Sequence, residues 1–244
     1  MSNAAYGLAG AGEFGVNVAV RGETASVAEV VEDCGGRLVD SEVADIVLAV
    51  GHPAVLSLAD QPPAAPVLPV TPGGGVHAVA RDELSAALTA VADGYYRTVT
   101  HPILALAVDD EPVARAVEDA MLITAEPARI SEYGVATETG HADRFRADGV
   151  VVATPLGSDG YARAAGGPTL TTDAGLAVVP VAPFSTHART WVSNPPMTLT
   201  VERDEGDVTL LADDQELVVV PPWEPVEITV PETFDLVRIP ELGE

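Results

Sequence analysis

The spacing of apolar residues changes near residue 98, and this change limits the chain to two kinds of structure in succession. Before residue 98, short apolar runs such as 45–50 alternate with segments of helical spacing such as 82–92. This alternation predicts a parallel sheet with helices on its faces, because parallel strands need long crossover connections. We therefore expect an α/β domain over residues 1–98.

After residue 98, the apolar residues come in short runs that Pro, Gly and Asp separate, which is typical of an all-β fold with turns. We expect an all-β domain over 99–225, and a C-terminal strand over 226–244 that returns toward the first domain. A segment near 158–165 has the spacing of a short helix. The apolar runs are 103–108, 120–124, 129–135, 149–153, 176–182, 197–202, 207–211, 217–220 and 226–230.

The charge of the chain is strongly one-sided. It has 37 acidic and 12 basic residues, a formal net charge of -25, and every basic residue is Arg. Such a charge repels itself in dilute buffer, whereas at molar salt the Debye length falls to about 3 Å, so the composition predicts an acidic, halophilic protein. The acidity argues against a nucleic-acid partner, and the absence of Lys excludes a phosphate-loop Lys or a Schiff-base Lys.

The remaining composition points to a soluble cytoplasmic protein. Cys34 is the only cysteine, so no intrachain disulfide can form. The N-terminus has no basic segment and no apolar run approaches the ~20 residues of a membrane span, so we expect no membrane partner. No two His residues have the spacing of metal ligands, so we expect no metal site.

The segment from Asp148 to Pro168 combines an apolar run with a cluster of Gly and hydroxyl residues. Its sequence is Asp-Gly-Val-Val-Val-Ala-Thr-Pro-Leu-Gly-Ser-Asp-Gly-Tyr-Ala-Arg-Ala-Ala-Gly-Gly-Pro. An apolar strand, 149–153, leads into a Thr-Pro turn that is followed by Gly and hydroxyl residues. Main-chain N–H groups and hydroxyls gathered at a strand end suit ribose and phosphate oxygens. On the residues alone, a tight strand-to-helix turn without a ligand stays open.

This segment resembles, without a gap, the NAD kinase motif Asp-Gly-x-x-x-x-Thr-Pro-x-Gly-Ser-Thr-Ala-Tyr-x-x-Ser-x-Gly-Gly-Pro. The resemblance covers about residues 16 to 238, and Asp213-Asp214-Gln215 resembles the family's Asp-Gly-Gln hairpin. It implies the family's fold, a Rossmann-like parallel α/β domain followed by an all-β domain. In the family this segment grips NAD, often with a neighbouring subunit contributing, which implies NAD or NADP as a ligand and a homo-oligomer.

The resemblance also supplies candidate residues for the dinucleotide. Glu118-Asp119 stands where the family has Asn-Glu or Asn-Asp, a pair that contacts adenine and ribose. Three positions depart from the motif, because Asp159, Gly160 and Ala164 replace Thr, Ala and Ser and leave fewer hydroxyls for the ribose. The candidate contacts are Glu118, Asp119, Arg146, Asp148, Thr154, Gly157, Ser158, Asp159, Gly160, Tyr161 and Ala164.

The catalytic loop of the family is replaced in this chain. After the strand 45–50 the family has Gly-Gly-Asp-Gly-Thr, in which the Asp takes the proton from the ribose 2′-hydroxyl and helps to hold the metal. Here that position reads Gly51-His52-Pro53-Ala54-Val55, with Pro53 in place of the Asp. Proline has no N–H to offer a phosphate, and loss of a general base alone costs roughly 10²–10⁴ in rate.

These observations support a degenerate NAD kinase homologue of haloarchaeal type that binds NAD(P) or another nucleotide without efficient phosphoryl transfer. An active kinase, using Mg²⁺ with ATP or polyphosphate and a rebuilt site, stays open, with Asp159 as the substitute acid and His52 as a weaker candidate base. A non-catalytic scaffold or partner subunit, for instance of an active NAD kinase paralogue, is a further alternative. A lipid or sphingoid-base kinase fits less well, because those enzymes also use the missing Gly-rich loop.

Overall fold

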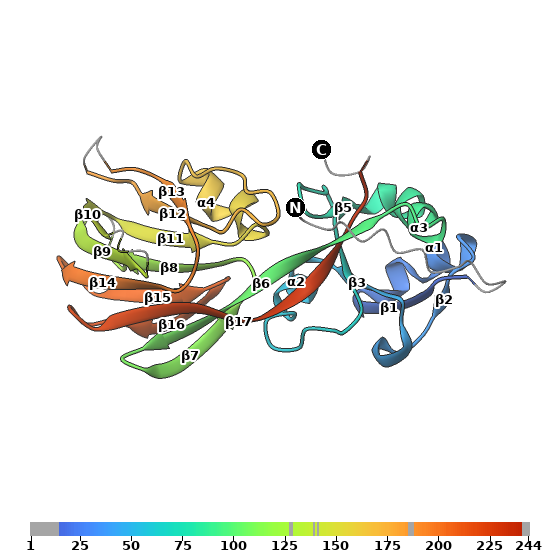
Figure 1. Ribbon diagram of the computed structural model, residues 1–244, viewed down its shortest axis with the longest axis horizontal. Coiled ribbons are helices and arrows are strands. Elements are labelled where there is room, and N and C mark those ends of the chain that lie inside the picture. Colours follow the sequence, from blue (N-terminus) through green and yellow to red (C-terminus); the bar gives the residue numbers. More distant parts are fainter. Residues whose placement is uncertain (1–14, 127–128, 139, 141, 185–187, 241–244) are drawn as a thin grey trace. The chain divides into compact units, whose positions relative to one another are not determined.

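The computed structural model describes residues 15–126, 129–138, 140, 142–184 and 188–240. The chain divides into two compact units. Unit 1 comprises the chain up to His101 and the segment from Phe234 onward, and unit 2 comprises Pro102–Thr233. Two long strands, β6 (Arg97–Val108) and β17 (Pro225–Arg238), each contribute residues to both units. The predicted fold class, an α/β part followed by an all-β part, is confirmed (Figure 1).

Unit 1 is built on a parallel sheet with the strand order β17-β4-β3-β1-β2, to which β5 adds beside β4. Its elements are β1 (Asn17–Gly22), α1 (Ala28–Asp33), β2 (Arg37–Leu38), β3 (Ile46–Val50), α2 (His52–Leu56), β4 (Val67–Thr71), β5 (Val79–Ala80) and α3 (Leu84–Ala92), with 3-10 turns at Thr24–Ser26, Ser41–Val43 and Arg81–Glu83.

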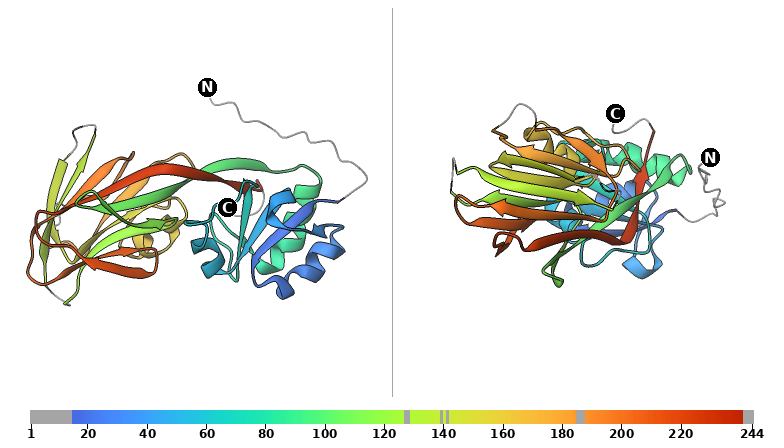
Figure 2. Two further views of the ribbon diagram at one scale, coloured as in Figure 1. Left: turned by 90° about the horizontal axis from the view of Figure 1, so that it is seen from below. Right: turned by 60° about the vertical axis from the view of Figure 1, so that its left-hand side comes forward.

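The central strand of this sheet is covered on both faces. All five residues of β3 are buried, as expected for a parallel strand with an uninterrupted apolar sequence. Helices α1 and α3 lie side by side against one face (Figure 2) and pack on alternate strand residues such as Ile46 and Leu48. Helix α2 follows β3 directly and contacts β1 and β3. The carboxyl end of β3, where ligands bind in open parallel sheets, therefore leads straight into α2.

Unit 2 consists of two sheets with an apolar core between them. One sheet has the order β13-β12-β11-β8-β15-β16, and the other contains β10-β9-β14-β17 together with β6 and β7. Besides β6 and β17, its elements are β7 (Glu111–Ala116), β8 (Asp119–Thr124), β9 (Ser131–Thr137), β10 (Ala142–Ala147), β11 (Gly149–Ala153), α4 (Tyr161–Ala164), β12 (Leu176–Val181), β13 (Trp191–Ser193), β14 (Met197–Arg203), β15 (Val208–Ala212) and β16 (Gln215–Val219), with a 3-10 turn at Gly157–Asp159.

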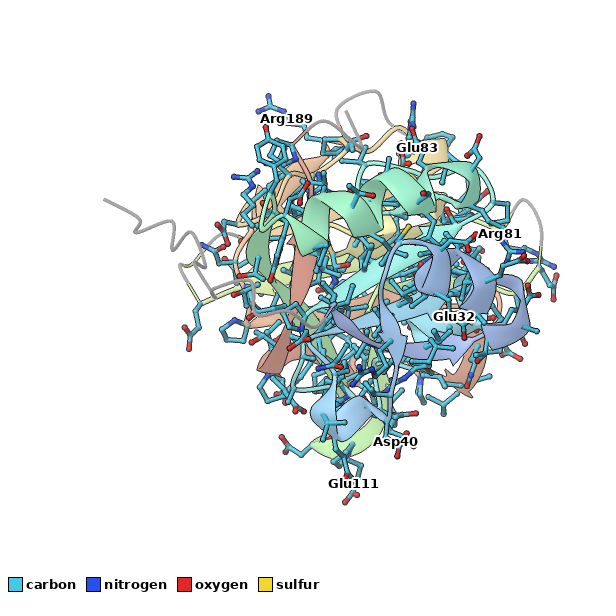
Figure 3. The ribbon with its side chains drawn as sticks, turned by 90° about the vertical axis from the view of Figure 1, so that its right-hand side faces the viewer. Glu32, Asp40, Arg81, Glu83, Glu111 and Arg189 are labelled. Carbon is cyan, nitrogen blue, oxygen red and sulfur yellow. The ribbon has the colours of Figure 1, made fainter. Side chains whose placement is uncertain are left out.

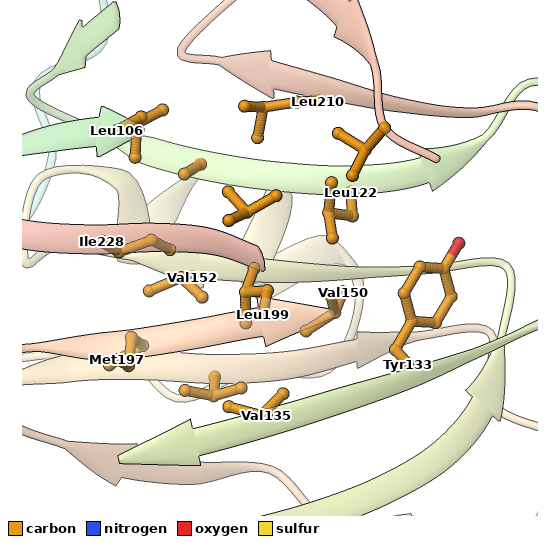
Figure 4. Packing of buried hydrophobic residues seen from close by; sticks show 14 of the residues in the cluster. Leu106, Leu122, Tyr133, Val135, Val150, Val152, Met197, Leu199, Leu210 and Ile228 are labelled. Carbon is orange, nitrogen blue, oxygen red and sulfur yellow. The ribbon is translucent and has the colours of Figure 1, made fainter. Parts of the chain in front are cut away.

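Strand β11 shows how the alternation of side chains builds this unit. Val150 and Val152 face the core between the sheets (Figure 4), and Val151 and Ala153 face the opposite side. There they pack with Ala162 of α4, so a strand buried on both faces ends beside the short helix. The sequence prediction of a helical turn within 158–165 is thereby confirmed.

A small polar network lies inside the core. The Tyr133 hydroxyl donates to the main-chain oxygen of Asp148 at 3.1 Å and is bonded to the Thr124 hydroxyl at 2.9 Å. Thr124 in turn donates to the Ser131 hydroxyl at 3.0 Å. Burial raises the pKa of Tyr133 to about 12, so the phenol stays neutral. Since β8 and β9 belong to different sheets, these bonds link the two sheets across the core.

Among the described residues, no helix has the length and apolar character that crossing a membrane requires.

Candidate functional site

The turn after β11 is fixed by the side chain and main chain of Thr154. This threonine is fully buried, and its hydroxyl donates to the main-chain oxygen of Val117 at 2.6 Å. The same hydroxyl accepts the N–H of Gly157 at 3.3 Å, and the Thr154 N–H donates to the oxygen of Glu118 at 2.8 Å. Thr154 therefore attaches the turn to the segment that enters β8, and its hydroxyl has both its donor and an acceptor site in use.

Gly157 lies directly against the main chain of Glu118. A Cβ atom at this position would come within 2.5 Å of the Glu118 carbonyl carbon and 2.9 Å of its Cα. Backbone atoms cannot move aside as the end of a flexible side chain can, so only glycine allows this approach. The Gly of the motif thus serves the packing of two main-chain segments.

Ser158 and Asp159 have different surroundings although they are neighbours. The buried Ser158 hydroxyl donates to the oxygen of Pro155 at 2.7 Å and accepts the N–H of Leu170 at 2.9 Å. It thus holds the turn together and does not face solvent. The half-buried Asp159 carboxylate forms an ion pair with Arg163, one turn further along α4.

Asp213, in the turn between β15 and β16, organises the segment Val117–Asp119. Its carboxylate accepts the N–H groups of Val117 at 3.2 Å, Glu118 at 2.8 Å and Asp119 at 3.1 Å. Its own N–H donates to the oxygen of Asp119 at 2.9 Å. Burial raises the pKa of Asp213 to about 6, although the three N–H donors favour the ionised form. The sequence marked this residue only as part of a hairpin.

The main-chain hydrogen bonds within this site limit the groups that it can present to a ligand. Every main-chain N–H and oxygen of Val117–Asp119 is bonded to Asp213 or Thr154, so only side chains of this segment can reach a ligand; Glu118 is half-buried and Asp119 is buried. Beyond the turn, Gly160, Tyr161 and Ala164 are exposed, with Tyr161 exposed to 43%. Hydrogen-bond acceptors and one aromatic ring suit hydroxyl and amino groups of a nucleoside.

Arg146 and Asp148 lie elsewhere in the same unit. Asp148 precedes β11 and Thr154 follows it, so six residue steps of extended chain, about 20 Å, separate them. The exposed Arg146 guanidinium lies over the Phe184 ring at 5.7 Å from its centroid, and the Phe184 N–H donates to the Arg146 oxygen at 2.9 Å. The structure therefore brings together the predicted contacts within 118–119 and 154–164 but not these two.

In unit 1, the main chain of residues 51–55 is largely engaged in local hydrogen bonds. Gly51 has a φ of 87°, and its N–H donates to Val70 at 2.8 Å. The N–H groups of Ala54 and Val55 both donate to the oxygen of Gly51, at 3.0 and 3.3 Å, and Pro53 has no N–H. His52 and Pro53 are exposed and open the first turn of α2. This bend consequently lacks the row of available N–H donors that a phosphate needs.

Within the part of the chain that the structure describes, no three His, Cys, Asp or Glu side chains form a group that could hold a metal ion. The acidic side chains of the site are Glu118, Asp119, Asp159 and Asp213.

Comparison with known protein families and curated sequences gives a consistent result. The family model of the ATP-NAD kinase C-terminal domain matches residues 117–238. An NAD kinase of Methanosarcina acetivorans is 34% identical over 124 residues, 50% of this chain and 45% of that protein. An NAD kinase of Symbiobacterium thermophilum is 31% identical over 210 residues, 80% of this chain and 74% of that protein. For the methanogen relatives, the matched part spans about half of their length or less.

Two solved structures share the fold. An NAD kinase from Archaeoglobus fulgidus in complex with ATP superposes with a TM-score of 0.66 and 22% identity, covering 91% of this chain and 93% of that one. Yeast NADH kinase complexed with NADH gives a TM-score of 0.70 and 14% identity, covering 93% and 84%. The site described above lies within the residues that the family model matches.

Proposed function

The chain belongs to the NAD kinase family, and from that premise we propose that it binds NAD or NADP without efficient phosphoryl transfer. The observation that carries this proposal is a contrast between two loops. The loop Thr154–Tyr161 is hydrogen-bonded through Thr154 to the main chain of Val117 and Glu118. The loop Gly51–Val55 has lost the Asp of the family motif, and its main chain is engaged in local bonds.

The proposed binding of NAD or NADP depends on side chains that accept hydrogen bonds. Ionised carboxylates accept hydrogen bonds only, so Glu118 and Asp119 suit ribose hydroxyls and the amino group of adenine. The exposed ring of Tyr161 offers a surface for a ribose or a base. The site is strongly acidic, so the ligand's phosphates lie away from Glu118 and Asp119.

The catalytic half depends on what replaces the family's acid. Phosphoryl transfer needs positioned donors, a metal and an oriented nucleophile. Pro53 supplies neither a carboxylate nor an N–H, and the described residues hold no group of metal ligands. We therefore expect turnover to be lower than in active NAD kinases by at least the roughly 10²–10⁴ that a general base contributes.

An active NAD kinase with a rebuilt site is the alternative, and Asp159 is its candidate acid. The ion pair with Arg163 favours a structural role for this carboxylate. Under this alternative the donor is ATP or polyphosphate with Mg²⁺, and Asp159→Ala abolishes activity.

The separation of Arg146 and Asp148 from the Thr154 turn supports a homo-oligomer as part of the proposal. Strand β11, about 20 Å of extended chain, lies between Asp148 and Thr154 in one chain, and a second copy that supplied one of these groups would bring both to one ligand. A mass in sedimentation above the 25.1 kDa of one chain supports this arrangement. A non-catalytic scaffold or partner subunit is the second alternative.

The deciding experiment combines turnover and binding in molar KCl. The protein is incubated with NAD, Mg²⁺ and ATP or polyphosphate, and NADP is detected by a coupled dehydrogenase; NAD, NADP and NADH are also titrated calorimetrically. Binding without turnover is the expected result. Turnover that is lost in Asp159→Ala, and kept in the control Asp214→Ala, contradicts the degenerate interpretation. Absence of all binding leaves the scaffold alternative.

A further inference from the structure

The turn between β15 and β16 carries two neighbouring carboxylates, and only that of Asp213 is hydrogen-bonded to the segment Val117–Asp119. Asp213 is mostly buried and accepts three main-chain N–H groups, whereas its neighbour Asp214 is exposed. The backbone of Asp213 has a φ of 52°, a left-handed conformation that Asp tolerates better than most residues. Because of this geometry, both the carboxylate and the N–H of Asp213 bond to one short segment.

Asp213 and Thr154 hold that segment from two directions. The Asp213 carboxylate accepts hydrogen bonds from the three N–H groups of Val117–Asp119, and the Asp213 N–H donates to the Asp119 oxygen. The Thr154 hydroxyl donates to the Val117 oxygen, and the Thr154 N–H donates to the Glu118 oxygen. Without the carboxylate, three N–H groups at a partly buried position lose their acceptor together, and each loss is costly.

We propose that Asp213 is a positioning residue, which holds Glu118 and Asp119 in the conformation that binds the dinucleotide. This inference rests on the proposed function, because the ligand contacts are those of Glu118 and Asp119. Asp213 acts through their main chain and has no ligand contact of its own. Preorganisation of this kind raises affinity because the segment need not be ordered when the ligand arrives.

The electrostatic surroundings make the contribution of Asp213 dependent on pH. Acidic groups adjoin it: Glu118 and Asp119 lie on the segment it holds, and Asp214 follows it in the turn. Burial raises the pKa of Asp213 to about 6, with a smaller contribution in the same direction from Glu118. Only the ionised carboxylate accepts from all three N–H groups at full strength, so the hold weakens as pH falls through about 6.

The test compares Asp213→Asn with the matched control Asp214→Asn, which removes the same charge from the same turn. In molar KCl at about pH 7.5, we expect NAD to bind Asp213→Asn about tenfold or more weakly than wild type, and Asp214→Asn to bind as wild type does. Between about pH 8 and pH 5, affinity of the wild type falls through about pH 6 more than that of Asp213→Asn. Equal affinities and equal pH profiles in the three proteins overturn the proposal.

Amide hydrogen exchange tests the same inference without a ligand or a variant. In the wild type, protection factors of the Val117, Glu118 and Asp119 amides should fall below about pH 6, while those of Leu122 and Val151 in the adjoining strands stay constant. Unchanged protection of the three amides shows that Asp213 does not hold the segment and overturns the proposal. A pH-dependent loss of protection in a protein that binds no dinucleotide refutes the proposed function instead, so the two failures are distinguishable.

Discussion

At the scale of single residues, Gly157 packs directly against the main chain of Glu118. A Cβ atom there meets the Glu118 main chain, so Gly157→Ala must displace either the Thr154 turn or the segment that enters β8. We expect a loss of about 1–3 kcal/mol in the free energy of unfolding and NAD affinity about tenfold lower. Denaturant titration and calorimetry in molar KCl measure the two effects.

Gly206→Ala is the control for this substitution. A Cβ atom at Gly206 has its nearest neighbour at 3.6 Å, an ordinary contact, and its φ lies outside the left-handed region. The exchange should therefore leave the free energy of unfolding within about 0.5 kcal/mol of wild type. Equal losses from both exchanges contradict the steric argument at Gly157.

A second prediction at this scale concerns Asp213 and the pH dependence of stability. Its folded pKa of about 6 lies above the ordinary value of 3.8. Between these values the folded chain holds a proton that the fully unfolded, solvated chain has released, so the group's contribution to global stability is largest below about pH 4 and is lost as pH rises through about 6. Local loosening of Val117–Asp119 has the opposite pH dependence, because it leaves the carboxyl buried without the N–H donors that favour its ionised form. The change amounts to at most about 3 kcal/mol.

Asp213→Asn removes this dependence because an amide does not titrate, whereas Asp214→Asn should keep it. Urea unfolding of both variants in molar KCl, from about pH 4 to about pH 7, gives the difference between their pH slopes. The free energy of Asp214→Asn is expected to fall more steeply with pH over this range. Parallel slopes contradict the prediction.

At the scale of strands and sheets, Tyr133 links the two sheets of unit 2 through its hydroxyl (Figure 4). Tyr133→Phe keeps the ring and removes the bonds to Thr124 and to the Asp148 oxygen, so we expect it to cost about 1–2 kcal/mol. Tyr161→Phe makes the same chemical change at an exposed position and should cost less than about 0.5 kcal/mol. Chemical denaturation measures both, and indistinguishable midpoints exclude a contribution of the network to stability.

The strands that could be predicted from the sequence are those with continuous apolar runs. Strands β3 and β11 are buried on both faces, so each position is apolar and the run is plain. Strands β7 and β10 went unpredicted because charged residues interrupt them, as in Glu-Pro-Val-Ala-Arg-Ala and Ala-Asp-Arg-Phe-Arg-Ala. Strand β13 has three residues, which is too short for any periodicity to show.

The candidate site was predictable where the sequence itself forms the turn. Residues 154–164 are contiguous, and a single motif marks them. Asp213 lies about fifty residues beyond that motif in an acidic chain, and its role exists only because β8 and β15 pair. The burial of the Thr154 and Ser158 hydroxyls was equally hidden, because both a ligand contact and an internal bond require the same residue types.

At the scale of the whole molecule, the excess of acid cannot be neutralised from within the chain. If each of the 12 basic residues paired with one acid, 37 − 12 = 25 acidic side chains would still have no cationic partner. Carboxylates such as those of Glu32, Asp40, Glu83 and Glu111 are exposed, and those of Asp40 and Glu111 point away from the ribbon in Figure 3. Their mutual repulsion opposes the compact state and is largest where salt is low.

Stability should therefore depend strongly on ionic strength. The Debye length falls from about 10 Å at 0.1 M to about 3 Å at 1 M salt, so the repulsion is progressively screened. We expect the midpoint of thermal unfolding to rise by about 10 °C or more over this range in KCl, roughly 3–5 kcal/mol for a chain of this size. Potassium sulfate at equal ionic strength separates the causes. Screening predicts equal midpoints in the two salts, whereas exclusion of sulfate from the surface predicts a rise in sulfate alone and contradicts the argument from charge.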